Sequence, residues 1–192
     1  MAKKILLVDC FDSFTMNLHH YIEQFAELDL RRVDKLDLDE IENYDAIVLS
    51  PGPKLPKDFP ILEQIIQNYH QHKPILGVCL GMQALADFFG FELQQLQQVK
   101  HGLSEELIDI DHQFPLFRGL EQPIFVARYH SWQIEPSSKL KQDFHYSTFA
   151  KDQSLMAFQH KTLPILGVQF HPESIMTPQG LKMIEHWVGS LD

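Results

Sequence analysis

The segment Pro74-Ile75-Leu76-Gly77-Val78-Cys79-Leu80-Gly81 decides the fold. Its first five residues form a short apolar run, which is typical of a parallel strand buried on both faces of a sheet. Apolar residues at helical spacing follow the second glycine, and Gly90 is expected to cap the C-terminal end of that helix. The segment therefore predicts a buried strand, a tight turn that carries Cys79, and a helix.

The same alternation extends through the first half of the chain. Further buried strands are predicted at residues 5–8 and 45–50, where the sequence is apolar and the second run ends in Pro51-Gly52-Pro53. Apolar residues at helical spacing predict one helix from Phe14 to Leu28 and another at residues 61–69. Strands that alternate with helices indicate a doubly wound parallel sheet.

The second half has a different character. Residues 91–160 predict short strands and turns without a long helix, and Thr177 with Pro178 predicts the cap and first turn of a closing helix through Val188. We therefore expect an α/β fold with a doubly wound, mostly parallel sheet flanked by helices. A small antiparallel, strand-rich section belongs to the second half, and one domain spans residues 1–192.

The pentapeptide Pro-Ile-Leu-Gly-Val occurs at residues 74–78 and again at 164–168. We interpret the two copies as central strands in similar packing environments, with a duplicated module as the alternative. Each strand brings the residues that follow it to the carboxyl edge of the sheet, where open α/β folds place their sites. These residues are Cys79-Leu80-Gly81 and Gln169-Phe170-His171.

Composition excludes several classes of function. The chain has 192 residues, with 16 Lys and Arg against 26 Asp and Glu, and a net charge of −10. An acidic balance disfavours binding to nucleic acid or to an anionic membrane. The two cysteines provide no disulfide framework, and neither an apolar span nor a signal peptide is evident, so we expect a cytoplasmic protein.

No metal or cofactor is expected. His70 and His72 point to different sides of a predicted helix, and His19 and His20 are adjacent in sequence. Ser50-Pro51-Gly52-Pro53 has too few glycines for a phosphate-binding loop.

Cys79 is the candidate nucleophile. Gly-x-Cys-x-Gly between a strand and a helix is a nucleophile-elbow pattern with sulfur in place of oxygen, and a β-carbon at either glycine would clash in so tight a turn. The helix N-terminus lowers the pKa of a thiol there, and the N–H of Leu80 would face an oxyanion. The alternative is a buried structural cysteine.

His171-Pro172-Glu173 supplies the other half of a thiol–imidazole–carboxylate site. Residues two apart in an extended segment point to the same side, so the Glu173 carboxylate can reach the His171 ring. Eleven histidines make chance pairings common, and the position after a buried strand is what favours this pair. Gly52, after the second strand, is a candidate second oxyanion donor, or part of a plain rigid turn.

Together these motifs resemble the class I (triad) glutamine amidotransferases over about residues 5–188. The matching motifs are Ser50-Pro51-Gly52-Pro53, Gly77-Val78-Cys79-Leu80-Gly81-Met82-Gln83, His101-Gly102, Arg128-Tyr129-His130-Ser131 and Val168-Gln169-Phe170-His171-Pro172-Glu173-Ser174. The run Asp12-Ser13-Phe14-Thr15-x-Asn17 is similar to the chorismate-using branch, the small subunits (component II) of anthranilate and aminodeoxychorismate (para-aminobenzoate) synthases.

The resemblance implies a flavodoxin-like three-layer fold and a mechanism. Cys79 attacks the carboxamide of L-glutamine, His171 transfers the proton to ammonia, and Glu173 orients His171. The Gly52 and Leu80 N–H groups hold the oxyanion, and ammonia passes to a chorismate-binding synthase subunit (component I) near the Asp12–Asn17 run. The residues expected to contact glutamine are Gly52, Pro53, Gln83, Ser131 and Trp132.

The sequence departs from the family at a few positions outside the triad. Lys54 stands where glycine is usual, and a left-handed backbone there would cost about 1–2 kcal/mol. Met82 replaces a common histidine, Trp132 a usual leucine, and Cys10-Phe11 a usual Asn-Tyr.

Several other functions remain open at this stage. They are an amidotransferase subunit of another pathway, such as imidazole-glycerol-phosphate synthase, a free-standing cysteine hydrolase of similar fold, and an inactive binding module. Because the chain ends one helix after the triad, no fused synthase domain is expected.

Overall fold

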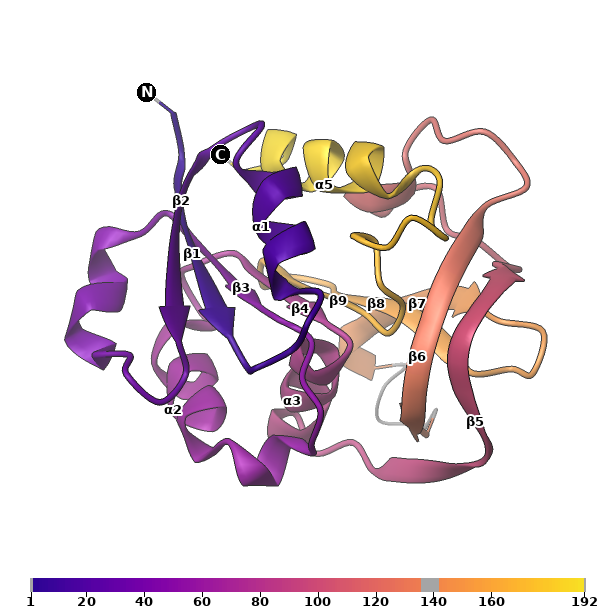
Figure 1. The fold of residues 1–192 in the computed structure, drawn as a ribbon, viewed down its shortest axis with the longest axis horizontal. Coiled ribbons are helices and arrows are strands. Elements are labelled where there is room, and N and C mark those ends of the chain that lie inside the picture. The colour runs from indigo at the N-terminus through magenta and orange to yellow at the C-terminus, as the bar shows by residue number, and fades with distance from the viewer. Residues whose placement is uncertain (1, 136–141, 192) are drawn as a thin grey trace.

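A seven-stranded sheet forms the centre of the protein in the computed structural model, which describes residues 2–135 and 142–191 (Figure 1). The strand order is β2-β1-β3-β4-β9-β8-β7. The first five strands in this order run parallel, and β8 and β7 are antiparallel additions at one edge. The bounds are β1 (Lys4–Asp9), β2 (Glu27–Arg32), β3 (Ala46–Leu49), β4 (Ile75–Val78), β7 (Phe144–Phe149), β8 (Leu155–His160) and β9 (Ile165–Val168).

Helices cover both faces of this sheet. On one face lie α1 (Thr15–Ile22) and α5 (Gly180–Gly189), and on the other α2 (Pro60–Tyr69) and α3 (Leu80–Phe88) (Figure 1). Each face buries its own apolar cluster, one including Leu18 and Trp187 and the other Ile65 and Leu85. The expected three-layer, doubly wound fold is confirmed, and the parallel strands follow the flavodoxin-like order. Short 3-10 helices occur at Leu38–Asn43, Pro56–Asp58 and Pro115–Phe117.

The two copies of Pro-Ile-Leu-Gly-Val lie side by side. Strands β4 and β9 pair in parallel with like residues opposite, so that Gly77 pairs with Gly167 and Val78 with Val168. The interpretation of both copies as central strands is confirmed. This register brings the residues that follow each strand to the same level of the carboxyl edge.

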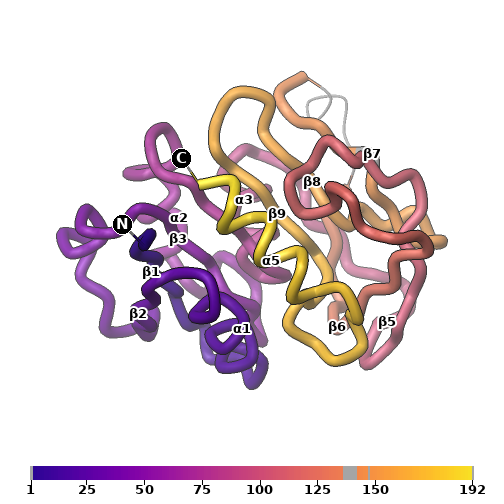
Figure 2. The backbone as a smooth tube through the Cα atoms, turned by 90° about the horizontal axis from the view of Figure 1, so that it is seen from above, coloured from indigo at the N-terminus to yellow at the C-terminus, as the bar shows by residue number. Residues whose placement is uncertain are grey.

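A two-stranded antiparallel ribbon stands beside that edge. It consists of β5 (Leu93–Glu106) and β6 (Phe125–Ile134), and Figure 2 shows it on the opposite side of the molecule from β1 and β2. The expected antiparallel section is confirmed, although β7 and β8 extend the main sheet rather than the ribbon. The part of that prediction that covers residues 136–141 lies outside the described residues.

Two helix boundaries differ from the sequence prediction. The helix predicted from Phe14 to Leu28 ends at Ile22, and Glu27–Arg32 forms β2 on the edge of the sheet. Phe25 and Leu28 happen to continue the helical spacing, but the alternation Glu27-Leu28-Asp29-Leu30-Arg31 is the pattern of a half-buried strand.

The closing helix α5 begins at Gly180 rather than at Thr177. Its N-cap is Gln179, which makes no side-chain cap hydrogen bond. The Thr177 hydroxyl instead donates to the carbonyl of His171 at 2.7 Å and accepts from the N–H of Ala127 at 2.9 Å. This residue therefore ties β6 to the segment after β9.

The C-terminal cap of α3 agrees with the sequence. Gly90 has a φ of +78°, its N–H donates to the carbonyl of Asp87, and the N–H of Phe91 donates to that of Ala86. This pair of bonds is the Schellman arrangement. Within residues 2–135 and 142–191, none of the helices has the length and apolar character to cross a membrane.

Candidate active site

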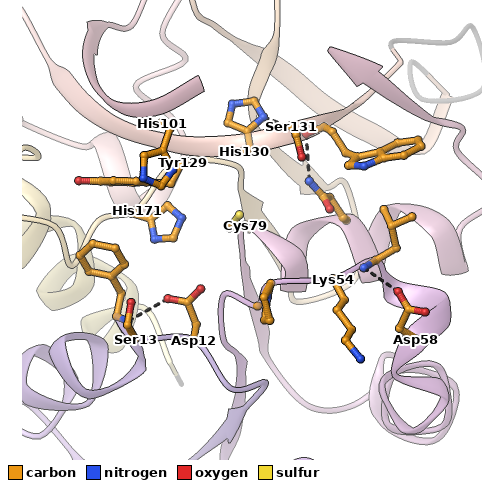
Figure 3. A pocket seen from close by; sticks show the side chains of 16 residues that line it. Asp12, Ser13, Lys54, Asp58, Cys79, His101, Tyr129, His130, Ser131 and His171 are labelled. Carbon is orange, nitrogen blue, oxygen red and sulfur yellow. Dashed lines mark hydrogen bonds between the residues drawn. The ribbon is translucent and has the colours of Figure 1, made fainter. Parts of the chain in front are cut away.

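A cavity of about 360 Å³ opens at the carboxyl edge of the parallel strands (Figure 3). Its walls come from the loops after β1, β3, β4 and β9 and from the inner side of the ribbon. The lining residues are Asp12, Ser13, Phe14, Gly52, Pro53, Lys54, Leu55, Asp58, Cys79, Gln83, His101, Tyr129, His130, Ser131, Trp132 and His171. The cavity therefore collects most of the side chains that the sequence selected.

Cys79 sits on a strained turn at the N-terminus of α3. Its backbone has φ +52° and ψ −101°, and its N–H donates to the carbonyl of Val168 at 2.7 Å. A positive φ is unfavourable for a residue with a β-carbon, and strain of this kind is typical of a nucleophile elbow. Figure 3 shows the Cys79 sulfur at the back of the cavity.

The two flanking glycines make this turn possible. A β-carbon on Gly77 would come 2.5 Å from the carbonyl carbon of Gly81, and one on Gly81 would overlap the carbonyl oxygen of Leu49. The steric reason for Gly-x-Cys-x-Gly is confirmed. The first turn of α3 packs directly on β3 and β4 because these positions lack side chains.

His171 and Glu173 form a buried pair behind the cavity. The Nδ1 of His171 lies 2.7 Å from Oε1 of Glu173, and the two residues are 2% and 1% exposed. Since a carboxylate only accepts, Nδ1 carries the proton and Nε2 is the basic nitrogen. Nε2 is buried without a hydrogen-bond partner, and Figure 3 shows the ring on the side of the cavity that faces Cys79.

The backbone of His171 is fixed as firmly as its ring. Its N–H donates to the carbonyl of Ala127 at 3.0 Å, which forms an isolated bridge between β6 and the segment after β9. Its own carbonyl accepts from Thr177. The ring also contacts Phe14 and Tyr129 edge to face, with centroids 5.4 and 5.1 Å away.

The electrostatic surroundings favour a charged His171. Burial alone would disfavour the imidazolium, but the neighbouring Cys79 sulfur and the Glu173 carboxylate outweigh it and raise the pKa of His171 well above its usual value. The group can therefore hold a proton taken from the thiol, which is what a Cys–His pair requires.

Gly52 and Leu80, the two residues predicted to supply oxyanion donors, pack against each other. The Ser50 hydroxyl accepts from the N–H of Cys10 at 2.9 Å and donates to the carbonyl of Pro51 at 2.8 Å, which pins the turn after β3 to β1. A β-carbon on Gly52 would overlap the side chain of Leu80. Leu80 is the first residue of α3, where backbone N–H groups have no partner within the helix.

The residues predicted to contact the substrate come from three parts of the cavity lining: the loop after β3, helix α3 and the ribbon strand β6. Pro53, Ser131 and Trp132 line the cavity together with Gln83. The Nε2 of Gln83 donates to the carbonyl of Trp132 at 3.1 Å and to Oε1 of Gln169 at 3.0 Å. Both of its amide protons are therefore committed within the protein, and only its oxygen is left to meet a substrate.

The comparisons with known proteins agree with this geometry. The family model described as glutamine amidotransferase class-I matches residues 6–190. The chain belongs to the class-I glutamine amidotransferases. The resemblance noted in the sequence is thereby confirmed.

Curated relatives are similar over nearly the whole amidotransferase chain. Aminodeoxychorismate/anthranilate synthase component 2 of Bacillus subtilis is 39% identical, covering 96% of this chain and 95% of the relative. Aminodeoxychorismate synthase component 2 of Escherichia coli is 38% identical, covering 96% and 98%. Anthranilate synthase component 2 of Lactococcus lactis is 37% identical, covering 98% and 95%.

Solved structures confirm the fold of the amidotransferase. A protein of Thermoplasma acidophilum, described as a candidate subunit of GMP synthase, aligns with a TM-score of 0.86 at 25% identity, covering 98% of this chain and 94% of that one. A glutamine amidotransferase of Thermotoga maritima aligns with a TM-score of 0.72 at 17% identity, covering 99% and 82%.

The residues that differ from the usual amidotransferase sequence have different positions relative to the cavity. Among described residues other than glycine, positive φ occurs at Phe11, Cys79, Asp109 and Gln153, so the left-handed strain considered for Lys54 does not arise. Met82 is buried and packs against Gly167 rather than lining the cavity. Lys54 and Trp132 do line it.

A buried cluster supports the ribbon wall of the amidotransferase cavity. Arg128 is fully buried and contacts Glu105, Asp152 and Ser154, while its Nε donates to Nε2 of His130 at 3.0 Å. Burial and the Arg128 charge lower the pKa of His130 to about 4, so its ring is neutral at physiological pH. The sequence analysis included Arg128 and His130 in the motif Arg128-Tyr129-His130-Ser131, but it assigned no role to either residue.

The two cysteines of the amidotransferase are in different environments. Cys10 is fully buried, and burial raises the pKa of its thiol to about 12, although a hydrogen bond with Ser50 works in the other direction. Cys79 is 6% exposed and lines the cavity. Only Cys79 is therefore placed to act as a nucleophile.

The histidines of α1 differ from the sequence interpretation. Within the described part of the chain, His19, His20 and Glu23 bring three potential metal-ligand atoms within 4.8 Å of one another. The Nδ1 of His20 lies 2.8 Å from Glu23 Oε1, and that of His19 lies 3.5 Å from Oε2. Adjacent histidines thus converge on one carboxylate, outside the cavity.

Proposed function

We propose that this chain hydrolyses L-glutamine to glutamate and supplies the ammonia to a separate chorismate-binding synthase subunit (component I). One observation supports the hydrolysis above all. Cys79, on its strained turn, neighbours the buried His171, and the Nδ1 of His171 is hydrogen-bonded to Glu173. We further propose that residues 1–192 act as one amidotransferase domain and that the protein works in the cytoplasm.

The proposed reaction uses side chains and water alone. The Cys79 proton moves to Nε2 of His171, and the thiolate attacks the carboxamide carbon of glutamine. His171 returns the proton to the departing ammonia, which leaves a glutamyl thioester on Cys79. Water, deprotonated by His171, then hydrolyses the thioester, and the thiol is restored.

The remaining site residues have binding roles in this scheme. The N–H groups of Gly52 and Leu80 stabilise the oxyanion, and the packing of the Leu80 side chain against Gly52 supports placing the two residues at one site. Gly52, Pro53, Ser131 and Trp132 line the cavity as glutamine contacts, and Gln83 contributes its free oxygen.

The choice of acceptor rests on the relatives and on the loop after β1. The three curated relatives are named as component 2 of aminodeoxychorismate synthase, of anthranilate synthase or of both. Asp12, Ser13 and Phe14, which belong to the run that resembles this branch, line the same cavity as Cys79. A partner that contacts this run would lie next to the source of ammonia.

The test compares two nitrogen sources. The chain and the chorismate-binding subunit of the same organism are mixed, and aminated product is measured with glutamine and then with an ammonium salt. We expect Cys79→Ala to abolish the glutamine-dependent reaction and to leave the ammonium-dependent reaction unchanged, because the thiol generates ammonia but takes no part in chorismate chemistry. Glutamine-dependent activity in Cys79→Ala would refute the proposal.

The isolated chain provides the second part of this test. We expect low glutaminase activity alone and at least a tenfold rise with the partner, which corresponds to about 1.4 kcal/mol of transition-state stabilisation. Full activity that no chorismate-binding protein changes would instead indicate a free-standing hydrolase. Activation by a nucleotide synthase or by an imidazole-glycerol-phosphate synthase subunit would assign the chain to another pathway.

A further inference from the structure

Gln169 is a buried polar residue in contact with the nucleophile. It follows β9 as Cys79 follows β4, and it is fully buried. Its Nε2 donates to the Cys79 sulfur over 3.6 Å. Burying a side-chain amide costs free energy unless both its oxygen and its nitrogen form hydrogen bonds, so the orientation of this amide matters.

Hydrogen bonds fix the direction of this amide, beginning at the ribbon. The Nε of Arg128 only donates, so Nε2 of His130 accepts and its Nδ1 carries the proton. That Nδ1 lies 2.8 Å from the carbonyl oxygen of Trp132, to which it donates. The Trp132 carbonyl is thereby anchored as an acceptor on the cavity wall.

Gln83 and Gln169 extend this chain of hydrogen bonds from the Trp132 carbonyl to the Cys79 sulfur. Because a carbonyl cannot donate, the Gln83 atom that faces Trp132 must be Nε2. The same Nε2 faces Gln169, so the facing atom of Gln169 must be its oxygen. The amide nitrogen of Gln169 then necessarily points at Cys79. A flipped amide would set N–H against N–H at one end and oxygen against sulfur at the other.

We propose that Gln169 is a further catalytic residue: its Nε2–H donates to the Cys79 sulfur and stabilises the thiolate formed when the thiol proton moves to His171 Nε2. The proposal rests on the proposed function, since it assigns Gln169 to the same thiol. The proton only changes place between Sγ and Nε2, so the step requires no other reactant.

Burial makes this hydrogen bond significant. Cys79, His171 and Gln169 are 6%, 2% and 0% exposed, so only a small part of their surface can be solvated. In such surroundings a fixed N–H donor replaces part of the lost solvation, and hydrogen bonds to a charged acceptor are the stronger kind. The thiol form accepts the same bond more weakly. Gln169 therefore favours the ion pair over the neutral pair.

Other charged and titratable groups line the same cavity or contact His171, and they would also affect the titration of Cys79. His171 and Glu173 follow β9, and His101, Tyr129 and His130 come from the ribbon. Asp12 follows β1, while Lys54 and Asp58 follow β3. A change confined to Gln169 leaves all of these groups in place, so a shift in the Cys79 titration reports the lost amide.

The experiment measures the rate of Cys79 alkylation by iodoacetamide against pH, followed by the mass of the Cys79 peptide. Gln169→Met keeps the length of the side chain and removes the donor. We expect the midpoint of the profile to rise by about one pH unit, with alkylation below it about tenfold slower, because thiolate falls tenfold per unit. Gln169→Glu should raise the midpoint further, because a carboxylate repels the thiolate.

Gln83→Met provides a second and independent variant. It leaves Gln169 in the chain but removes the group that fixes its direction, so the midpoint should rise by a smaller amount. If Gln169→Met fails to fold, this variant carries the test. Thr148→Val is the matched control, since Thr148 is fully buried, lies outside the cavity and has an unpartnered hydroxyl. Its alkylation profile should equal that of the unmodified protein.

The outcomes separate this proposal from the proposed function. An unchanged alkylation midpoint in folded Gln169→Met and Gln83→Met would overturn the role of Gln169 alone. Glutaminase activity in Cys79→Ala would overturn both, since the thiol would then not be the nucleophile. A raised midpoint together with a roughly tenfold loss of kcat/KM for glutamine in Gln169→Met supports the assignment.

Discussion

Gly180 lies directly against Pro172. A β-carbon on Gly180, the first residue of α5, would overlap the carbonyl oxygen of Pro172 and approach its carbonyl carbon to 2.7 Å. Pro172 stands between His171 and Glu173, so the start of α5 supports the segment that carries the proposed base and its carboxylate.

This contact predicts the effect of Gly180→Ala. The new methyl group must push Pro172 away from α5, which we expect to cost about 1–3 kcal/mol of unfolding free energy and to displace His171 from Cys79. Denaturant unfolding and glutaminase kinetics with the partner subunit measure the two effects. Gly189→Ala in the same helix is the matched control, because nothing lies within 4 Å of its β-carbon position. Equal behaviour of the two variants would contradict the role given to this contact.

The triad predicts unequal losses in two variants. In the proposed reaction His171 carries the proton, so His171→Ala should lower glutamine hydrolysis by several orders of magnitude. Glu173→Ala should lower it less, because Thr177, Ala127 and the neighbouring rings still hold His171 near its position. Steady-state kinetics of both variants tests this order. A loss in Glu173→Ala as large as in His171→Ala would show that the carboxylate does more than orient the ring.

The two thiols should react very differently with an alkylating reagent. At pH 7.5 we expect iodoacetamide to modify Cys79 and to leave Cys10 untouched, because Cys10 is fully buried and its pKa is raised to about 12. Peptide mass analysis of the native protein counts the modified sites. Both residues should react after unfolding in guanidinium chloride, which serves as the control, and modification of Cys10 in the native protein would contradict its burial.

His130 predicts a dependence of stability on pH. Its pKa is about 4 in the folded protein against an ordinary value of 6.5, so between these pH values the unfolded chain binds a proton that the folded chain does not. The contribution of His130 to the free energy of unfolding is therefore fully present above pH 6.5, and it is lost as the pH falls toward 4. By pH 5 the loss amounts to about 2 kcal/mol.

The measurement compares unfolding free energies at pH 7.5 and pH 5 in the unmodified protein and in His130→Gln. The variant is expected to be less stable overall, because the imidazole that joins Arg128 to the Trp132 carbonyl is replaced by an amide of different shape. Its stability should fall less between the two pH values. The same difference in both proteins would mean that His130 is not the group responsible.

The sequence was sufficient for the central part of the fold because its signals there are local. Both copies of Pro-Ile-Leu-Gly-Val are continuously apolar, as doubly buried strands must be, and the glycines around Cys79 follow from steric contact alone. The strand at Glu27–Arg32 was missed because Phe25 and Leu28 satisfy helical spacing by coincidence. Pairing with β1 decides its structure, and that pairing is not a local property.

In the candidate site too, local sequence could identify some residues, whereas others depend on contacts between distant parts of the chain. Cys79, His171 and Glu173 could be selected because their neighbours in sequence define their geometry. The role of Thr177 could not, because its hydroxyl bonds to Ala127, 50 residues away. Gln169 and Gln83 are 86 residues apart, and only the folded sheet brings their amides together. Two features of the sequence pointed to the position of Gln169, its place directly after the second copy of the pentapeptide and its place in the Val168–Ser174 motif, but neither gave its contact with Cys79.

The pairing of like residues in β4 and β9 raises the question of how the two strands find their alignment during folding. Their sequences are identical, so the order of residues alone gives little reason for one offset over another. The glycines supply the answer. A β-carbon on Gly77 would meet α3 at 2.5 Å, and one on Gly167 would come 2.7 Å from Met82. A shift of one residue would place Leu or Val beneath α3, which leaves no space for either. The missing side chains of Gly77 and Gly167 thus permit only one alignment of the two strands, and that alignment places Gln169 beside Cys79.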